Sequence, residues 1–199
     1  MRHLFLFAII SIITISSFAR TNGKREQVNP QNEKINQQKP QNKNEMKRLI
    51  AYFSATGTTA KVAEQIAQIC GGDLYEIKPS VKYTAADLDW KDQNSRSSVE
   101  MKNKASRPEI IKDLDDAQQY ETIYIGFPIW WYTAPTIINT FMEAYDFSGK
   151  RVYLFATSGG SSITKAVEDL RQSYPSVRIE EGKLLNGTSE TEIAEWIGK

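Results

Sequence analysis

The sequence predicts an α/β fold of the doubly wound kind, a three-layer sandwich built around a five-stranded parallel sheet. Short apolar segments with the pattern of strands alternate along the chain with amphipathic segments that have the pattern of helices. The apolar segments are hydrophobic at consecutive positions, which is typical of strands covered by helices on both faces. About 152 residues follow the N-terminal segment, enough for one domain with a substantial core.

Five segments have the strand pattern, and each is short and rich in apolar side chains. They are residues 48–53, 74–77, 122–127, 151–156 and 177–181. Pro128 directly follows the third segment, and a glycine pair follows the fourth. Both features indicate where a strand ends.

Four further segments have helical periodicity: residues 59–70, 135–145, 163–173 and 190–197. Gly71 and Gly72 end the first of them, as glycine commonly does at the C-terminus of a helix. Residues 78–107 interrupt the alternation with 30 charge-rich residues that show no clear period. Long segments of this kind in compact domains are usually functional lids or partner surfaces.

Residues 1–19 have the composition of a secretory signal peptide. A short basic start at Arg2 and His3 precedes the apolar residues 4–15, and Ser17 and Ala19 supply the small side chains of a cleavage site. The apolar run is shorter than the roughly 20 residues that a membrane span needs. We therefore expect export to the periplasm or cell envelope, with no transmembrane span in the mature chain. An uncleaved N-terminal anchor is the alternative.

Residues 20–47 are expected to form a disordered polar linker. Eleven of these 28 residues are Asn or Gln, and the only sizeable apolar side chains are Val28, Ile35 and Met46. Met46 also resembles an ordinary start, which would make the protein cytoplasmic. Residues 48–199 then form the folded domain, with 17 basic and 21 acidic residues. This acidic balance argues against a nucleic-acid partner, which requires a basic surface.

The single cysteine and the single histidine exclude several kinds of chemistry. Cys70 alone allows neither an intramolecular disulfide nor an all-cysteine metal or iron–sulfur site, and its position on a helix suits a small core residue. His3 lies in the segment expected to be removed. No histidine-based triad, metal site or proton shuttle is therefore expected in the mature protein.

The loop after the first predicted strand is rich in hydroxyl groups and leads directly into a helix. Residues 54–59 combine four hydroxyls, one glycine and the free N–H groups of a helix start, which together suit an anion. The loop has neither the Gly-Lys-Ser/Thr of nucleoside-triphosphate loops nor a Gly-x-Gly-x-x-Gly motif. A terminal phosphate monoester held by hydrogen bonds fits it. A Ser/Thr-rich helix cap without a ligand is the alternative.

The loops after the third and fourth strands suit a flat ring. Trp130, Trp131 and Tyr132 are consecutive and bounded by prolines, so they point in several directions and suit a rigid stacking wall. An aromatic plug or a dimer contact is the alternative. Residues 157–161 contain a glycine pair that lets backbone N–H groups approach a ring edge. Ligands bind where such loops converge at the carboxyl ends of parallel strands, and FMN has the required shape.

The three loops together resemble those of the flavodoxins, in the branch that also includes small NAD(P)H-dependent flavin and quinone reductases. The motifs Ser-x-Thr-Gly-x-Thr, Pro-Ile-Trp-Trp and Thr-Ser-Gly-Gly-Ser carry the resemblance, together with residues 83–90 and 106–108. It covers residues 48–198. It implies a flavodoxin-like fold with strand order 2-1-3-4-5 and non-covalently bound FMN.

The resemblance also implies which residues bind the cofactor. The loop at the phosphate contributes Ser54, Ala55, Thr56, Gly57, Thr58 and Thr59. The residues flanking the isoalloxazine are Pro128, Ile129, Trp130, Trp131 and Tyr132, and those on its pyrimidine side are Thr157, Ser158, Gly159, Gly160 and Ser161.

Because a flavin carries the redox chemistry itself, we expect no catalytic side chain and no metal. Aromatic stacking and an acidic surround disfavour added negative charge, which favours a low-potential one-electron carrier. Its partner would be a redox protein or a small-molecule electron acceptor, and the protein itself a monomer or weak homodimer. One alternative is an NAD(P)H-dependent FMN or quinone oxidoreductase with a second pocket shaped by residues 80–107. The other is a flavin-free envelope protein on the same scaffold.

Overall fold

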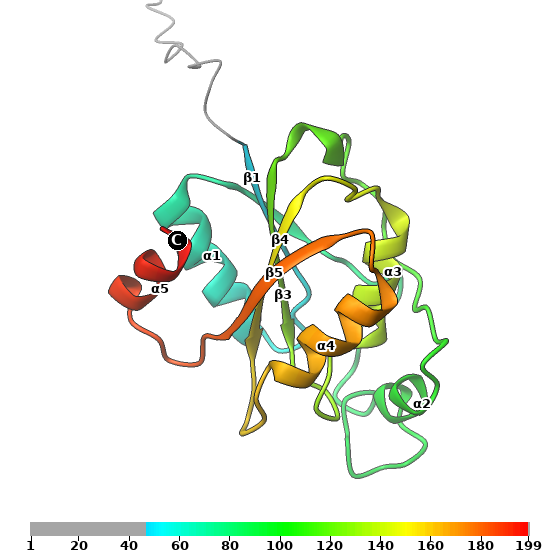
Figure 1. Cartoon of the computed structure of the whole chain (residues 1–199). Helices are drawn as coiled ribbons and strands as arrows, with labels where there is room; N and C mark the ends of the chain where they lie inside the picture. The colour runs from blue at the N-terminus through cyan, green and yellow to red at the C-terminus, as the bar shows by residue number, and fades with distance from the viewer. Residues whose placement is uncertain (1–46, 199) are drawn as a thin grey trace, which may run out of the picture. The chain divides into compact units, whose positions relative to one another are not determined.

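The computed structural model describes residues 47–198, so the predicted signal peptide and all of the predicted linker except Lys47 lie outside the described residues. The described part forms a five-stranded sheet in the order β2-β1-β3-β4-β5, with every neighbouring pair parallel (Figure 1). The strands are β1 Arg48–Tyr52, β2 Asp73–Glu76, β3 Thr122–Pro128, β4 Arg151–Thr157 and β5 Arg178–Leu184. The predicted fold class and strand order are confirmed.

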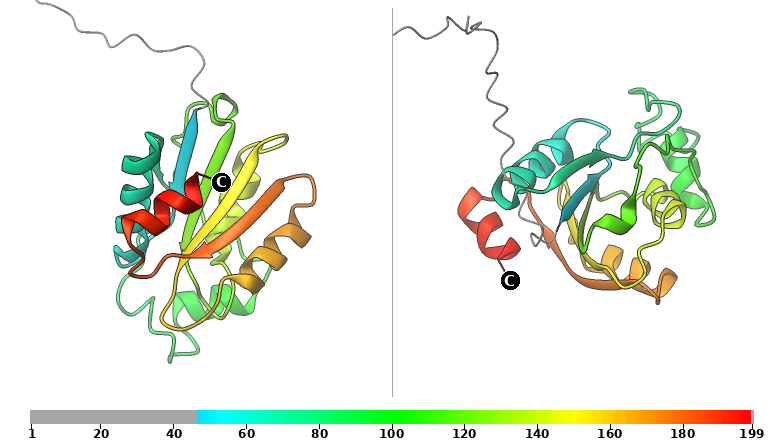
Figure 2. Two further views of the ribbon diagram at one scale, coloured as in Figure 1. Left: turned by 60° about the vertical axis from the view of Figure 1, so that its left-hand side comes forward. Right: turned by 90° about the horizontal axis from the view of Figure 1, so that it is seen from above.

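Helices cover both faces of the sheet, as Figure 2 shows: α1 and α5 lie on one face, and α3 and α4 on the other. The helices are α1 Thr58–Cys70, α2 Arg96–Lys102, α3 Thr136–Ala144, α4 Thr164–Ser173 and α5 Glu190–Ile197, with a short 3-10 helix at Ala117–Gln119. None of the helices in residues 47–198 combines the length and hydropathy needed to cross a membrane.

The hydrophobic core is divided by the sheet into two clusters. Side chains of β1, β3 and β4 such as Ile123 and Leu154 pack with α3 and α4 in the larger one. On the other face, α5 places the buried ring of Trp196 edge-on against Tyr124, with ring centroids 5.5 Å apart. Burying each large apolar side chain contributes about 1.5–3 kcal/mol to folding. The pattern of consecutive apolar residues in the central strands therefore reflects burial on both faces.

Gly126 allows β3 and β4 to pack at the carboxyl end of the sheet. It pairs with Phe155 in the β3–β4 register, and the fully buried Phe155 ring occupies the space that a side chain on Gly126 would need. Only glycine fits this close approach.

Besides the unpredicted 3-10 helix at Ala117–Gln119, two elements differ from the sequence prediction. Helix α2 lies inside residues 78–107, where no helix was expected. It escaped the prediction because it has only seven residues and buries Ser97 and Ser98 instead of an apolar stripe. Ser95 caps it by accepting a hydrogen bond from the Ser98 N–H. Strand β5 continues to Leu184, beyond the predicted end at residue 181, because its pairing with β4 persists past an irregularity between Val152 and Leu154.

Candidate functional site

A cavity of about 510 Å³ lies among the loops that follow the carboxyl ends of β1, β3 and β4. It is lined by Ala55, Thr56, Leu88, Trp90, Ser97, Pro128, Ile129, Trp130, Trp131, Tyr132 and Ser161. Eight of these residues belong to the three predicted loops, so the structure brings all three loops to one cavity. The other eight predicted site residues lie in the same loops but do not line it: Ser54, Gly57, Thr58, Thr59, Thr157, Ser158, Gly159 and Gly160.

The loop before α1 exposes donors for an anion. Gly57 precedes the helix with a φ of 87°, a conformation that glycine adopts without strain, and no side chain of the described residues caps the helix start. The Gly57 N–H donates to Ser54 Oγ at 3.1 Å, which closes the loop. The exposed hydroxyls of Thr56 and Thr58 lie 3.5 Å apart beside it. Uncapped N–H groups at the positive end of a helix, with exposed hydroxyls beside them, have the donors that an anion requires.

Thr59 and Thr157 are not among the residues that line the cavity. Both are buried, and their Oγ1 atoms are 2.8 Å apart in a hydrogen bond between the start of α1 and the end of β4. They connect two of the three loops instead of lining the cavity. Their hydrogen bond positions the two loops relative to each other, and the predicted contact of both residues with a cofactor stays a prediction.

Trp131 and Tyr132 form the tip of a tight two-residue turn. Their φ angles are 44° and 69°, and Trp130 and Thr133 exchange both backbone N–H···O hydrogen bonds at 3.0 Å across the turn. These are the features of a type I′ turn, which favours Asn and Gly at its two central positions. Two aromatic residues with positive φ store strain of a kind that clusters at binding sites. The turn holds both rings at the cavity wall.

Trp130 has a different role from its two neighbours. Its ring meets Phe53 and Tyr83 edge-on, with centroids 5.6 and 5.5 Å away, and packs against the larger core cluster. Trp130 therefore anchors the turn to the core while one side of it lines the cavity. Of the three consecutive aromatic residues, Trp130 anchors the turn to the core, whereas Trp131 and Tyr132 are exposed.

The loop after β4 is held by hydrogen bonds of its own. Ser158 Oγ accepts from the N–H groups of Gly160 and Ser161 at 3.1 and 2.7 Å, so these N–H groups, which we expected to face a ring, are engaged within the loop. The Ser158 N–H donates to Asn186 Oδ1 at 2.7 Å, and the Asn186 amide donates back to the Ser158 carbonyl. Asn186 was missed because a side chain that orients a distant loop leaves no local pattern.

Residues 78–107 supply the rest of the cavity wall. Leu88, Trp90 and Ser97 line it, and Trp90 is 65% exposed. Sequence reasoning expected this segment to shape a pocket, but it did not single out Leu88 or Ser97. Trp90, an aromatic residue in a polar segment, was the one signal in the sequence that this segment contributes to the cavity.

A half-buried polar cluster fixes the middle of this segment. Tyr83 donates to Glu100 Oε2 at 2.6 Å, and Arg96 donates to Glu100 Oε1 at 2.7 Å. The Arg96 guanidinium lies 3.9 Å from the centroid of the Tyr83 ring. Burial, with the hydrogen bond to Glu100, raises the pKa of Tyr83 well above its ordinary value. The cluster joins Tyr83 to Arg96 and Glu100 of α2 and so keeps α2 beside the cavity.

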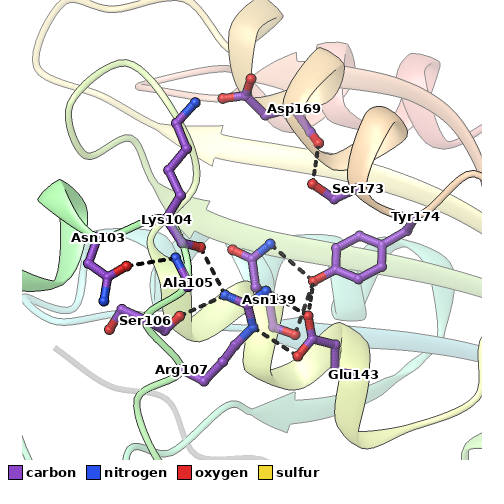
Figure 3. Close-up of polar contacts among 10 residues, drawn as sticks. All are labelled: Asn103, Lys104, Ala105, Ser106, Arg107, Asn139, Glu143, Asp169, Ser173 and Tyr174. Carbon is purple, nitrogen blue, oxygen red and sulfur yellow. Dashed lines mark hydrogen bonds and ion pairs between the residues drawn. The ribbon is translucent and has the colours of Figure 1, made fainter.

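The end of the segment is fastened to α3 and α4 by a second network (Figure 3). Arg107 donates from Nε and Nη2 to the two carboxylate oxygens of Glu143, at 2.8 Å each. Tyr174 donates to Glu143 at 2.9 Å, and Asn139 donates to the Tyr174 hydroxyl at 3.0 Å. Two parallel hydrogen bonds between a guanidinium and a carboxylate fix the relative orientation of the two side chains and also stabilise their contact.

The chemistry available at the cavity is binding and stacking. Its lining residues carry hydroxyls, indoles and apolar side chains and no charged group. Across residues 47–198, no group of three or more His, Cys, Asp or Glu side chains is placed to hold a metal ion. The arrangement combines hydroxyl groups from the loops after β1 and β4 with an aromatic wall from the loop after β3.

The sequence model of the flavodoxin family matches residues 47–199. The chain belongs to the flavodoxin family. A search of curated proteins returned no match.

Solved structures agree with this membership in the flavodoxins. A proposed flavoprotein from Bacteroides uniformis is 56% identical, with a TM-score of 0.75, covering 77% of this chain and 98% of its own. A second, from Bacteroides eggerthii, is 51% identical with a TM-score of 0.75, covering 76% and 96%. A flavoprotein from Lactobacillus acidophilus, solved in complex with FMN, is 26% identical with a TM-score of 0.59, covering 77% and 99%.

Proposed function

We propose that this flavodoxin binds FMN non-covalently and transfers electrons as an exported carrier. The observation that carries the proposal is one cavity lined by Ala55 and Thr56, in the loop that leads into the uncapped start of α1, and by the Trp131–Tyr132 turn. These features match the two ends of FMN, a phosphate monoester and a planar ring. The FMN complex of the Lactobacillus acidophilus relative supports the choice of cofactor.

The residues present fit this cofactor. The hydroxyls of Thr56 and Thr58 and the first N–H groups of α1 would hold the phosphate. The Trp131 indole would lie along the ring, and Trp90 would bound the cavity from the opposite segment. FMN, when bound, supplies the one-electron and two-electron redox chemistry.

The lining residues would make the bound ring difficult to reduce fully. None of the cavity-lining side chains is positively charged, and a ring stacked on the aromatic wall would be shielded from water on that face. Added negative charge is costly where neither water nor a cation compensates it. We therefore infer a lower reduction potential than that of free FMN, as suits a carrier that donates electrons one at a time.

A reductase acting on NAD(P)H is the second candidate function. The observation that favours it is the contribution of Leu88, Trp90 and Ser97 to the cavity, because a segment beside the ring can form a second substrate pocket. A carrier should oxidise NADH and NADPH negligibly with a quinone present as acceptor. Sustained turnover would assign the reductase function instead.

An anaerobic redox titration of the FMN-loaded protein tests the carrier function. The expected result is a potential for the fully reduced couple clearly below that of free FMN. An unshifted potential would contradict the proposal. Protein that stays colourless after FMN is added would instead support a flavin-free role for the same scaffold.

Export is inferred from residues 1–19, which lie outside the described residues. N-terminal sequencing of protein purified from cell fractions tests it. Cleavage after Ala19 in an envelope fraction is the expected result. A cytoplasmic protein beginning at Met46 would contradict it.

A further inference from the structure

Residues 84–94 carry Leu88 and Trp90 to the cavity, and we call these residues the flap. Nine of the eleven residues are exposed and none of them is buried. The flap consists of consecutive turns and contains no helix or strand. Segments with few buried contacts are those that open most easily in a folded protein.

The flap is attached to the rest of the domain from one side. The Ser97 N–H donates to the Asp87 carbonyl at 3.0 Å. Lys102 Nζ donates to the Gln93 carbonyl at 2.9 Å. Within the described part of the chain, every hydrogen bond that leaves the flap goes to α2 or to its N-cap, Ser95. Helix α2 is therefore the base on which the flap is mounted.

This base is firmly held. Arg96 and Glu100 of α2 form the polar cluster with Tyr83, which packs against the larger core cluster directly before the flap begins. Beyond α2, Arg107 donates two hydrogen bonds to Glu143 of α3 (Figure 3). Because the chain is fixed on both sides of the flap, movement is confined to the flap itself.

Trp90 is the side chain that closure of the flap would bury. It lines the cavity, yet it is 65% exposed and belongs to neither core cluster. A planar ring in the cavity would offer the indole a stacking surface, and this contact would remove apolar area from water. Leu88, half-buried at the same wall, would gain in the same way.

We propose that the flap is a lid, which closes when FMN binds and brings Trp90 into contact with the flavin ring. The inference rests on the proposed function, because the ring supplies the surface on which the lid closes. Closure slows the release of FMN and shields the ring from water, which raises the cost of added negative charge. A closed lid also fills the space in which a second substrate would lie, so it favours the carrier over the reductase.

Hydrogen–deuterium exchange of the full chain, with and without FMN, tests whether the lid closes. We expect FMN to slow amide exchange in residues 84–94 by about fivefold or more. Exchange in residues 96–102 should change much less, because α2 is already held by its own contacts.

Stopped-flow measurement of FMN release tests the role of Trp90. Trp90→Ala should release FMN about tenfold faster and lose the protection of the flap, because the stacking contact is removed. Trp90→Phe keeps a ring and should release FMN at an intermediate rate. Val99→Ala is the matched control, since Val99 is 53% exposed on α2 but does not line the cavity. This variant should release FMN at the wild-type rate.

The outcomes separate the lid from the proposed function. FMN binding with unchanged exchange in the flap would overturn the lid alone. Equal slowing in residues 84–94 and 96–102 would also overturn it, because that pattern reflects general stabilisation. A wild-type release rate in Trp90→Ala, with circular dichroism showing the variant folded, would do the same. A chain that binds no FMN would refute the proposed function and the lid together.

Discussion

Thr59 and Thr157 are joined by a hydrogen bond of 2.8 Å between their Oγ1 atoms, although 98 residues separate them in the chain. Thr59 lies in the first turn of α1 and Thr157 is the last residue of β4. The bond therefore fixes the loop before α1, proposed to hold the phosphate, relative to the loop after β4, proposed to contact the edge of the flavin ring. Both side chains are buried, so water does not replace the bond when it is lost.

Replacing either threonine with valine should destabilise the protein. Each single variant leaves one buried hydroxyl without a partner, which costs about 1–3 kcal/mol. The double variant should lose clearly less stability than the two single variants lose together, because it removes both hydroxyls and leaves neither without a partner. Urea unfolding of the wild type and the three variants measures the coupling. Additive losses would show that the two hydroxyls do not interact.

Gly126→Ala should destabilise the fold by about 1–3 kcal/mol, because its methyl group would overlap the buried Phe155 ring. Gly159→Ala is the matched control, since nothing lies within 4 Å of a Cβ built at that glycine. Thermal or urea unfolding of both variants provides the comparison. Equal stability of the two would mean that the β3–β4 packing at Gly126 is looser than in the structure.

Most of the fold could be predicted from local pattern. Each central strand is buried on both faces and therefore appears in the sequence as an uninterrupted apolar run. Helix α2 could not be found in this way, because it buries the hydroxyls of Ser97 and Ser98 and has no apolar stripe. Its stability depends on contacts of Arg96 and Glu100 with Tyr83, which only the folded chain brings together.

The lining of the cavity was predictable where its residues directly follow strands. Thr56, Trp131 and Ser161 lie on loops at one end of a parallel sheet, and they line one cavity. The contributions of Ser97 and Asn186 were not predictable, because each depends on the folded path of a distant segment. The burial of Thr59 was also missed, since a hydroxyl in a polar loop looks the same whether it faces a ligand or a neighbouring strand.

Tyr132→Gly tests whether the strained turn serves binding. Glycine adopts a φ of 69° without strain, so the free energy of unfolding should rise by about 1 kcal/mol. Flavin affinity should fall at the same time, because part of the cavity wall is lost. Tyr132→Phe keeps the ring and the backbone strain, and it should change neither quantity. A glycine variant with unchanged flavin affinity would show that Tyr132 does not contribute to the wall.

The Arg107–Glu143 pair should make stability depend on pH in a defined direction. The hydrogen bonds from Arg107 lower the pKa of the Glu143 carboxyl. The contribution of the pair is therefore complete above the pKa of an unfolded Glu, about 4.3, and is lost as the pH falls through the lower folded value.

Glu143→Gln should accordingly be less stable than the wild type near pH 7, by no more than about 1 kcal/mol because the pair is partly exposed. The difference should shrink as the pH falls below 4.3. Urea unfolding from pH 3 to pH 7 measures it, with Glu64→Gln on α1 as the control for removing a surface carboxylate. A difference that grows toward acid pH would contradict the assigned pairing.

Titration of the flavin-free protein with FMN and with riboflavin, followed by flavin fluorescence, tests the central claim most directly. The two ligands share the ring and differ at the phosphate, so their comparison isolates the loop before α1. We predict one FMN per chain, and riboflavin binding weaker by about a hundredfold. Equal affinities, or no saturable binding of FMN, would contradict the proposal that this cavity is a flavin mononucleotide site.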